Sequence, residues 1–275
     1  MLNPLFAFEH PFFVKAFIVV ILLSLVLPLM GITLAGRGFT MVSDTLSHTS
    51  LAGIAIGLAA GTFPMVWSIL ISLVAALIIE FIRRRFPKYS ELALTITLAL
   101  SLGLTGILSQ VVSSSRFESY LFGSLYTIND MELYILIGVV VLALAYEVLF
   151  YRSNIALAYN EEECKANGMK VIVLSTIDTV VTSLLVALAS NIIGALMVAC
   201  FVSIPVAISL KVTHSSKGAN YASIIASAAM SILGLFIAYT FNLHVGGTIV
   251  LTGIAILVFT ISGKYIIGKI KHHKH

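Results

Sequence analysis

The apolar residues of this chain form long continuous blocks that short polar stretches separate. Blocks such as Ile69–Ile79 and Val139–Ala145 lack the alternation of apolar and polar positions that is typical of a membrane-spanning β-strand. They match the run of about 20 apolar residues that a membrane-spanning helix needs. The pattern therefore predicts an all-α, polytopic integral membrane protein.

Nine blocks are long enough to cross a bilayer, and turn-forming residues such as Gly36–Gly38 and Phe86–Lys88 separate them. We expect about nine spans, and a count of eight also fits if one of the early blocks is interfacial or re-entrant. No linker divides the chain, so we expect a single transmembrane domain over residues 1–275. The expected spans lie near residues 14–35, 41–61, 63–82, 91–110, 132–150, 171–191, 193–212, 220–241 and 246–267.

Composition supports this interpretation, because 59% of the 275 residues are apolar and 10% are charged, whereas soluble domains carry about 25% charged residues. Nine spans use roughly 180 residues, which leaves no room for a sizeable soluble domain. The formal charge of +4 sits in short clusters between the apolar blocks. There it indicates topology within the lipid bilayer, so nucleic acid is not an expected partner.

The basic residues fall almost entirely on one side of the expected bundle. When nine spans alternate, all of the 16 lysines and arginines except Lys15 and Arg116 lie on the side that also holds the C-terminus. Cytoplasmic loops are enriched in lysine and arginine. We therefore expect an external N-terminus and a cytoplasmic C-terminus.

The second block opens with polar residues that a plain membrane anchor does not need. Asp44 and His48 are four residues apart, which places both side chains on one face of a helix. A carboxylate and an imidazole are suitable ligands for a divalent transition metal. The alternative is a structural role, either an ion pair or a helix start in which Ser43 or Asp44 caps the helix and His48 bonds to a neighbour.

Three other acidic residues lie within or near the ends of spans. For Asp178 we favour hydrogen bonding between helices over a position facing a pore. Glu80 and Glu147 lie near the cytoplasmic ends of their helices, where we expect them to reach towards water or to pair with neighbouring arginines. All three are therefore expected to be structural.

The longest polar insertion covers residues 151–170 on the expected cytoplasmic side. An acidic run is followed there by small residues, which predicts a short helix that a glycine ends. Such a projection suits the docking of a partner, and the alternative is a solvated loop. The residues in question are Glu161, Glu162, Glu163, Ala166 and Gly168.

Missing motifs exclude several classes of activity. The sequence contains no GxxxxGK[ST] phosphate loop, no HExxH and no GxSxG, so we expect neither ATP hydrolysis by this chain nor other enzymatic activity. Cys164 lies in a polar loop and Cys200 within an apolar block, which gives neither a disulfide framework nor a CxxC metal site. No bound cofactor is expected.

Four ordered segments resemble the permease subunits of bacterial ATP-binding-cassette importers for zinc and manganese. The block Ser43–His48 followed by Ser50–Gly53 is similar to that family's D-x-x-x-H motif. Further similarity lies in Tyr120–Ser124, in Gly194–Met197 with Ile204–Pro205, and in Gly246–Leu251.

The resemblance implies a multi-pass protein of the bacterial cytoplasmic membrane that imports a metal ion together with partners. These partners are a second copy of the chain, two cytoplasmic ATP-binding subunits and an extracytoplasmic metal-binding protein. It also implies that Asp44 and His48 contact the ion and that residues 161–168 form the coupling helix that docks on the ATPase. Lys165 and Asn167 depart from the family pattern, in which these positions are often apolar.

The same resemblance favours Zn²⁺ over Mn²⁺ as the transported ion. Ser43 and Ala52 stand where the manganese importers commonly carry Gly and Pro. A manganese importer stays an alternative, because carboxylate and imidazole serve both metals. A further alternative is a metal channel or secondary carrier that works without ATP.

Overall fold

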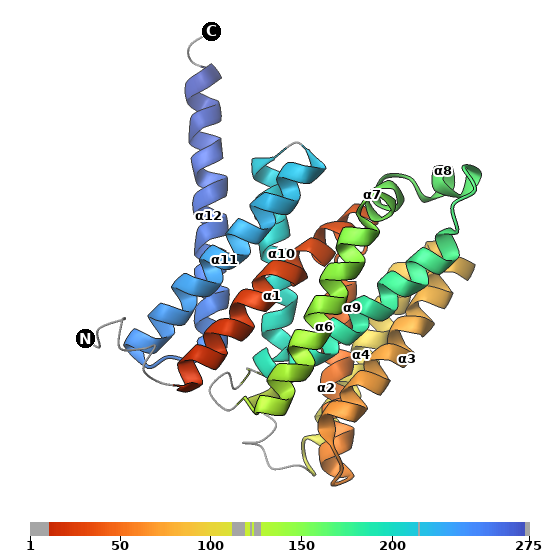
Figure 1. The fold of residues 1–275 in the computed structure, drawn as a ribbon, viewed down its shortest axis with the longest axis vertical. Coiled ribbons are helices and arrows are strands. Elements are labelled where there is room, and N and C mark those ends of the chain that lie inside the picture. Colours follow the sequence, from red (N-terminus) through yellow and green to blue (C-terminus); the bar gives the residue numbers. More distant parts are fainter. Residues whose placement is uncertain (1–10, 112–118, 122, 124–127, 214, 273–275) are drawn as a thin grey trace.

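The computed structural model describes residues 11–111, 119–121, 123, 128–213 and 215–272. Within these ranges the long elements are all helices and no strand occurs, which confirms the all-α prediction (Figure 1). Phe122 and Ser124 of one predicted family segment, Arg116 and residues 273–275 lie outside the described residues. The elements are α1 Pro11–Gly36, α2 Val42–Ala59, α3 Pro64–Arg85, η2 Pro87–Tyr89, α4 Ser90–Leu108, α6 Asp130–Leu149, α7 Tyr151–Tyr159, α8 Glu161–Ala166, α9 Val171–Ile193, α10 Ala195–Val212, α11 Ser216–Phe241 and α12 Val245–His272.

Eight helices of the described chain are long and apolar enough to cross a membrane. The ninth long helix, α2, is not among them, although it has 18 residues. Its first half carries Asp44, His48 and several hydroxyl side chains, which lower its hydropathy. The range of eight to nine spans expected from the sequence reflects this single ambiguous helix.

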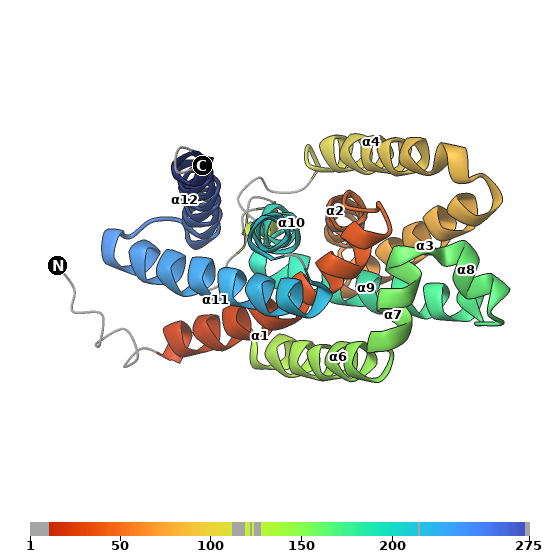
Figure 2. The same cartoon turned by 90° about the horizontal axis from the view of Figure 1, so that it is seen from above.

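The polar helix α2 lies inside the bundle and packs against α3, α4, α9 and α10 (Figure 2). Its hydroxyl groups are buried, and within the described part of the chain all of them except that of Ser43 donate a hydrogen bond to a backbone carbonyl. Ser47 donates to the backbone carbonyl of Ser43 on its own helix, and Ser50 donates to the carbonyl of Ala187 on α9. Neighbouring helices therefore compensate for the low hydropathy of α2.

Two glycines let the backbones of α2 and α3 approach each other closely. A Cβ atom added at Gly53 would lie 2.6 Å from the Cα of Ser68, and one at Gly57 would lie 2.7 Å from the Cα of Pro64. Small residues four positions apart are the common means of bringing two membrane helices together. The metal-ligand candidates on α2 are thus attached firmly to α3.

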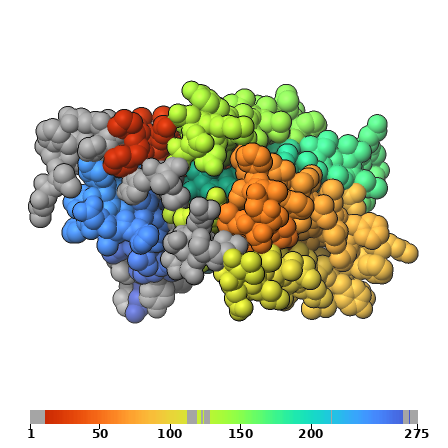
Figure 3. All heavy atoms as spheres, turned by 90° about the horizontal axis from the view of Figure 1, so that it is seen from below, coloured from red at the N-terminus to blue at the C-terminus, as the bar shows by residue number. Residues whose placement is uncertain are grey.

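One end of the bundle, which we call the basic end, gathers the turn after α1 and the end of α3. It holds Arg37, Arg83, Arg84 and Arg85. The short helices α7 and α8 project at the same end, at the upper right of Figure 1. Figure 3 looks onto the opposite end, where the turn between α2 and α3, in orange, lies between the start of α6 and the end of α4.

Candidate functional site

The candidate metal pair lies in the first two turns of α2. Asp44 Oδ1 and His48 Nε2 are 3.6 Å apart, and 39% of the Asp44 side chain and 13% of the His48 side chain are exposed. The Nδ1 atom of His48 is buried and has no hydrogen-bond partner among the described residues. One face of α2 therefore presents a carboxylate oxygen and an imidazole nitrogen side by side.

The capping alternative does not describe this helix start. Met41 occupies the N-cap position of α2, and no side chain makes a capping hydrogen bond there. The polar residues Asp44 and His48 are consequently not used to begin the helix. The remaining structural alternative, an ion pair between the two side chains, fits their 3.6 Å separation, and the same geometry also suits a shared ligand.

Among the described residues, Asp44 and His48 have no third candidate metal ligand beside them. Across the described residues, no three His, Cys, Asp or Glu side chains are grouped closely enough to hold an ion. An ion at Asp44 and His48 would thus need further ligands, such as water.

The second candidate region, α8, is the short glycine-ended helix that the sequence predicts. Asn160 caps its start by accepting a hydrogen bond from the Glu163 amide at 3.2 Å. At its end Gly168 adopts a left-handed φ of 76°, and the Met169 amide donates back to the Cys164 carbonyl. This is a Schellman ending. The buried Cys164 packs with Leu157 and Val171 and holds α8 against the bundle.

The predicted coupling residues differ in their exposure. Glu162, Glu163, Ala166 and Gly168 are exposed, whereas Glu161 is half-buried because it turns towards α3. Burial alone would raise the pKa of the Glu161 carboxyl, but hydrogen bonds from Arg83 and Lys165 outweigh it and lower the pKa below its ordinary value of 4.5. The outer face of α8 is left free, and one acidic side chain ties α8 to the bundle.

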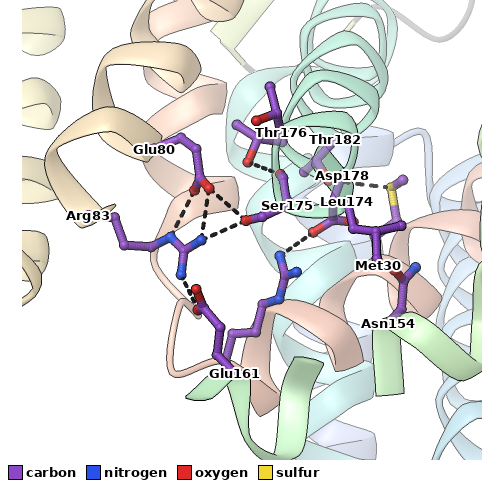
Figure 4. Close-up of polar contacts among 12 residues, drawn as sticks. Met30, Glu80, Arg83, Asn154, Glu161, Leu174, Ser175, Thr176, Asp178 and Thr182 are labelled. Carbon is purple, nitrogen blue, oxygen red and sulfur yellow. Dashed lines mark hydrogen bonds and ion pairs between the residues drawn. The ribbon is translucent and has the colours of Figure 1, made fainter. Parts of the chain in front are cut away.

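Arg83 is the centre of the contacts at the basic end, as Figure 4 shows. Its Nε and Nη2 donate to the two carboxylate oxygens of Glu80 at 2.8 Å, and its Nη1 donates to Glu161 Oε2 at 2.7 Å. Ser175 on α9 also lies within hydrogen-bond distance of Arg83 and of Glu80. The expected pairing of Glu80 with arginines is confirmed. The link to Glu161 was not expected, although the run Arg83–Arg85 and the acidic start of α8 were visible in the sequence.

Asp178 accepts a hydrogen bond from a distant segment, as predicted, but its partner lies in the turn after α1 and not on another helix. Its Oδ2 accepts a hydrogen bond from Arg37 Nη1 at 2.7 Å, and only 3% of the Asp178 side chain and 7% of the Arg37 side chain are exposed. Arg37 lies in the turn between α1 and α2, and Asp178 lies on α9. This buried ion pair fixes the turn that leads into the metal-ligand candidates.

The expectation for Glu147 is wrong. Glu147 is 6% exposed and neither reaches water nor pairs with an arginine. Its Oε2 accepts from Asn154 Nδ2 at 3.4 Å, and its Oε1 has no partner among the described residues. The cause is α7, which begins directly after α6 and places Asn154 beside the carboxylate. Glu147 and Asn154 line a cavity of about 380 Å³ whose walls come from α1, α6, α7, α10 and α11.

A comparison with protein-family models identifies the chain. The model of the ABC 3 transport family matches residues 9–264, which includes both candidate regions. The chain belongs to the ABC 3 transport family. It is thus a transport permease of the ATP-binding-cassette class, and the resemblance that the sequence motifs indicated is confirmed.

Individual members of the family align over nearly the whole chain. A "Probable metal transport system membrane protein" of Treponema pallidum is 29% identical over 255 residues, which cover 92% of this chain and 96% of that protein. The "Manganese import system permease protein ScaB" of Streptococcus gordonii is also 29% identical, with 92% and 91% covered. The solved structure "PsaBC from Streptococcus pneumoniae in complex with Fab" superposes with a TM-score of 0.81 at 28% identity, covering 93% of this chain and 92% of that one.

Proposed function

We propose that this chain is the membrane-spanning permease of an ATP-driven manganese importer, in which Asp44 and His48 contact the ion during passage. The observation that carries the proposal is the 3.6 Å approach of Asp44 Oδ1 and His48 Nε2 on a helix at the centre of the bundle. Ionisable residues inside a membrane domain are costly and usually serve function. A transport permease whose central helix carries such a pair suits a divalent cation.

The choice of manganese rests on the names of the relatives and on the burial of the two residues that favoured zinc. The relatives from Streptococcus gordonii and Streptococcus parasanguinis are named manganese import permeases, and they do not support the zinc preference predicted from the sequence. Ser43 and Ala52, which suggested zinc, are buried to 0% and 1% exposure by neighbouring helices. Residues packed in this way shape α2 but need not coordinate the ion.

The two ligands of one chain suit a transported ion rather than a resident one. Mn²⁺ favours octahedral coordination by oxygen-rich ligands, and two protein ligands leave most of its positions to water or to a second copy of the chain. A loosely completed site binds the ion and also releases it. A homodimer with two cytoplasmic ATP-binding subunits and an extracytoplasmic metal-binding protein is the assembly that fits this scheme.

The exposed face of α8 is the proposed contact with the ATP-binding subunit. Glu162, Glu163, Ala166 and Gly168 are exposed at the basic end, and the positive-inside rule places this end in the cytoplasm. The family assignment argues against a channel or carrier that works without ATP. Copurification of an ATP-binding subunit with the full chain would test this part of the proposal directly.

Uptake of radioactive Mn²⁺ and Zn²⁺ by cells with matched expression tests the metal role. We expect Asp44→Asn and His48→Gln each to reduce Mn²⁺ uptake by about tenfold or more, since losing one of few ligands costs over 1.4 kcal/mol. Asp130→Asn is the matched control, because its exposed pair with Lys15 contributes little. Near-normal uptake in both variants would remove the pair from the mechanism, and uptake of zinc but not manganese by the unchanged protein would reverse the choice of metal.

A further inference from the structure

We propose that Arg83 joins the helix that docks the ATPase to the helix that holds the metal ligands. The contact set Glu161, Arg83 and Phe39 is called the Arg83 joint below. This inference rests on the proposed function, because it assigns a path for the motion that ATP would drive. Arg83 is a positioning residue in this scheme, since it contacts neither the ion nor ATP.

The Arg83 guanidinium contacts four segments at once: α8, α9, its own helix α3 and the turn between α1 and α2. Its Nη1 donates to Glu161 Oε2 on α8 at 2.7 Å, while its Nε and Nη2 donate to Glu80 on its own helix (Figure 4). The ring of Phe39, in the turn between α1 and α2, lies 5.2 Å from the guanidinium carbon. Only 10% of the Arg83 side chain is exposed. A cation stacked on an aromatic ring and paired with two carboxylates holds one orientation.

The path from Phe39 to the metal-ligand candidates is short. The Phe39 carbonyl accepts a hydrogen bond from the Val42 amide at 3.2 Å, and α2 begins at Val42. Asp44 follows in the first turn of that helix. The other side of the same turn is fixed by the Arg37 pair with Asp178. A displacement of α8 that moves Arg83 therefore acts on a turn that contacts hold on both sides. This turn lies directly before the metal-ligand candidates.

A purely structural role would not require Glu161. Glu80 already supplies both carboxylate oxygens to Arg83, and Ser175 completes the contact with α9. Glu161 adds the ion pair between α8 and α3, while the side of α8 that holds Cys164 packs separately against Leu157 and Val171. Removing the Glu161 charge leaves the Glu80 pair and the apolar anchor intact. Such a variant removes the charge that ties α8 to the joint without dismantling the bundle.

The main experiment compares Glu161→Gln with the unchanged importer, reconstituted in proteoliposomes with its ATP-binding subunit and metal-binding protein. We expect assembly and ATP hydrolysis to persist, while the Mn²⁺ transported per ATP falls at least about fivefold, the lower range of coupling between distant sites. Glu91→Gln, an exposed carboxylate at the same end of the bundle, is the matched control and should leave the ratio unchanged. An unchanged ratio in Glu161→Gln would overturn the inference, as would an equal fall in both variants.

A double-mutant cycle tests the route through Phe39. If Arg83 passes motion from Glu161 to Phe39, the variant that combines Glu161→Gln with Phe39→Leu should lose less coupling than the sum of the two single losses. Additive losses would show that the two residues act independently and would contradict the joint.

A readout that needs no metal separates this inference from the proposed function. Met41, directly before α2, is 63% exposed, so a cysteine placed there can be labelled by a maleimide. We expect ATP to change the labelling rate of Met41→Cys, measured by mass spectrometry of that peptide, and Glu161→Gln to abolish the change. A persistent ATP effect in Glu161→Gln, or none in the parent, would overturn the joint. Failure of the proposed function would instead appear as absent Mn²⁺ uptake by the unchanged importer.

Discussion

Substituting alanine for Gly53 should loosen the contact between α2 and α3 and lower the stability of the whole bundle. The added methyl group would lie 2.6 Å from the Cα of Ser68 and from the carbonyl oxygen of Trp67, whereas ordinary contacts are 3.4–4 Å. Both neighbours are backbone atoms, so no side-chain rotation relieves the overlap. The two helices would have to separate by roughly 1 Å, and overpacking of this kind costs about 1–3 kcal/mol.

The measurement is the apparent melting temperature of the purified chain in detergent. It is determined from the amount of protein that stays monodisperse on size-exclusion chromatography after heating. At about 2–4 °C per kcal/mol, Gly53→Ala should melt roughly 2–12 °C below the parent protein. Gly106→Ala in α4 is the control, because nothing lies within 4 Å of its added Cβ and alanine favours a helix. An unchanged melting temperature for Gly53→Ala, or an equal decrease in the control, would refute the packing argument.

Two further substitutions test the basic end. Asp178→Asn should lower the free energy of unfolding by about 3–5 kcal/mol, because the Arg37 side chain, which is 7% exposed, would keep its charge without a counter-ion. A decrease in melting temperature no larger than that from losing a surface ion pair would contradict this. Gly168→Val should reduce metal-stimulated ATP hydrolysis of the assembled importer, because a φ of 76° costs a β-branched residue about 1–2 kcal/mol and destabilises the end of α8. Gly168→Asn tolerates that conformation and should retain activity, so an equal loss in both variants would show that the turn is not the cause.

The course of the helices was predictable because a membrane span is encoded locally. The expected block 171–191 corresponds to α9 Val171–Ile193. The ambiguous block 41–61 corresponds to α2, the one long helix of the described residues whose hydropathy is too low for a membrane span. The spacing of Asp44 and His48 likewise placed both on one face, because a helical repeat fixes the relation between neighbours four residues apart.

Contacts between distant segments were not predictable in the same way. Arg83 and Glu161 are 78 positions apart, and they meet because α8 packs against α7 and α9 while α3 packs against α9. The prediction for Glu147 failed for the same reason, since its surroundings depend on how the chain turns from α6 into α7 and where Asn154 lies as a result. A charge near a helix end indicates a polar contact, but its partner is decided by tertiary structure.

The low hydropathy of α2 has a consequence for how the chain is made. During synthesis, α2 leaves the ribosome long before α9 and α10, yet these later helices complete the burial that α3 and α4 begin, and the Ala187 carbonyl accepts the Ser50 hydrogen bond from 137 residues away. Apolar length drives the insertion of ordinary spans, and α2 falls short of it. Part of the buried environment of this polar helix therefore forms only after α9 and α10 have been translated, and a chain shortened before α9 would leave Ser50 without its acceptor.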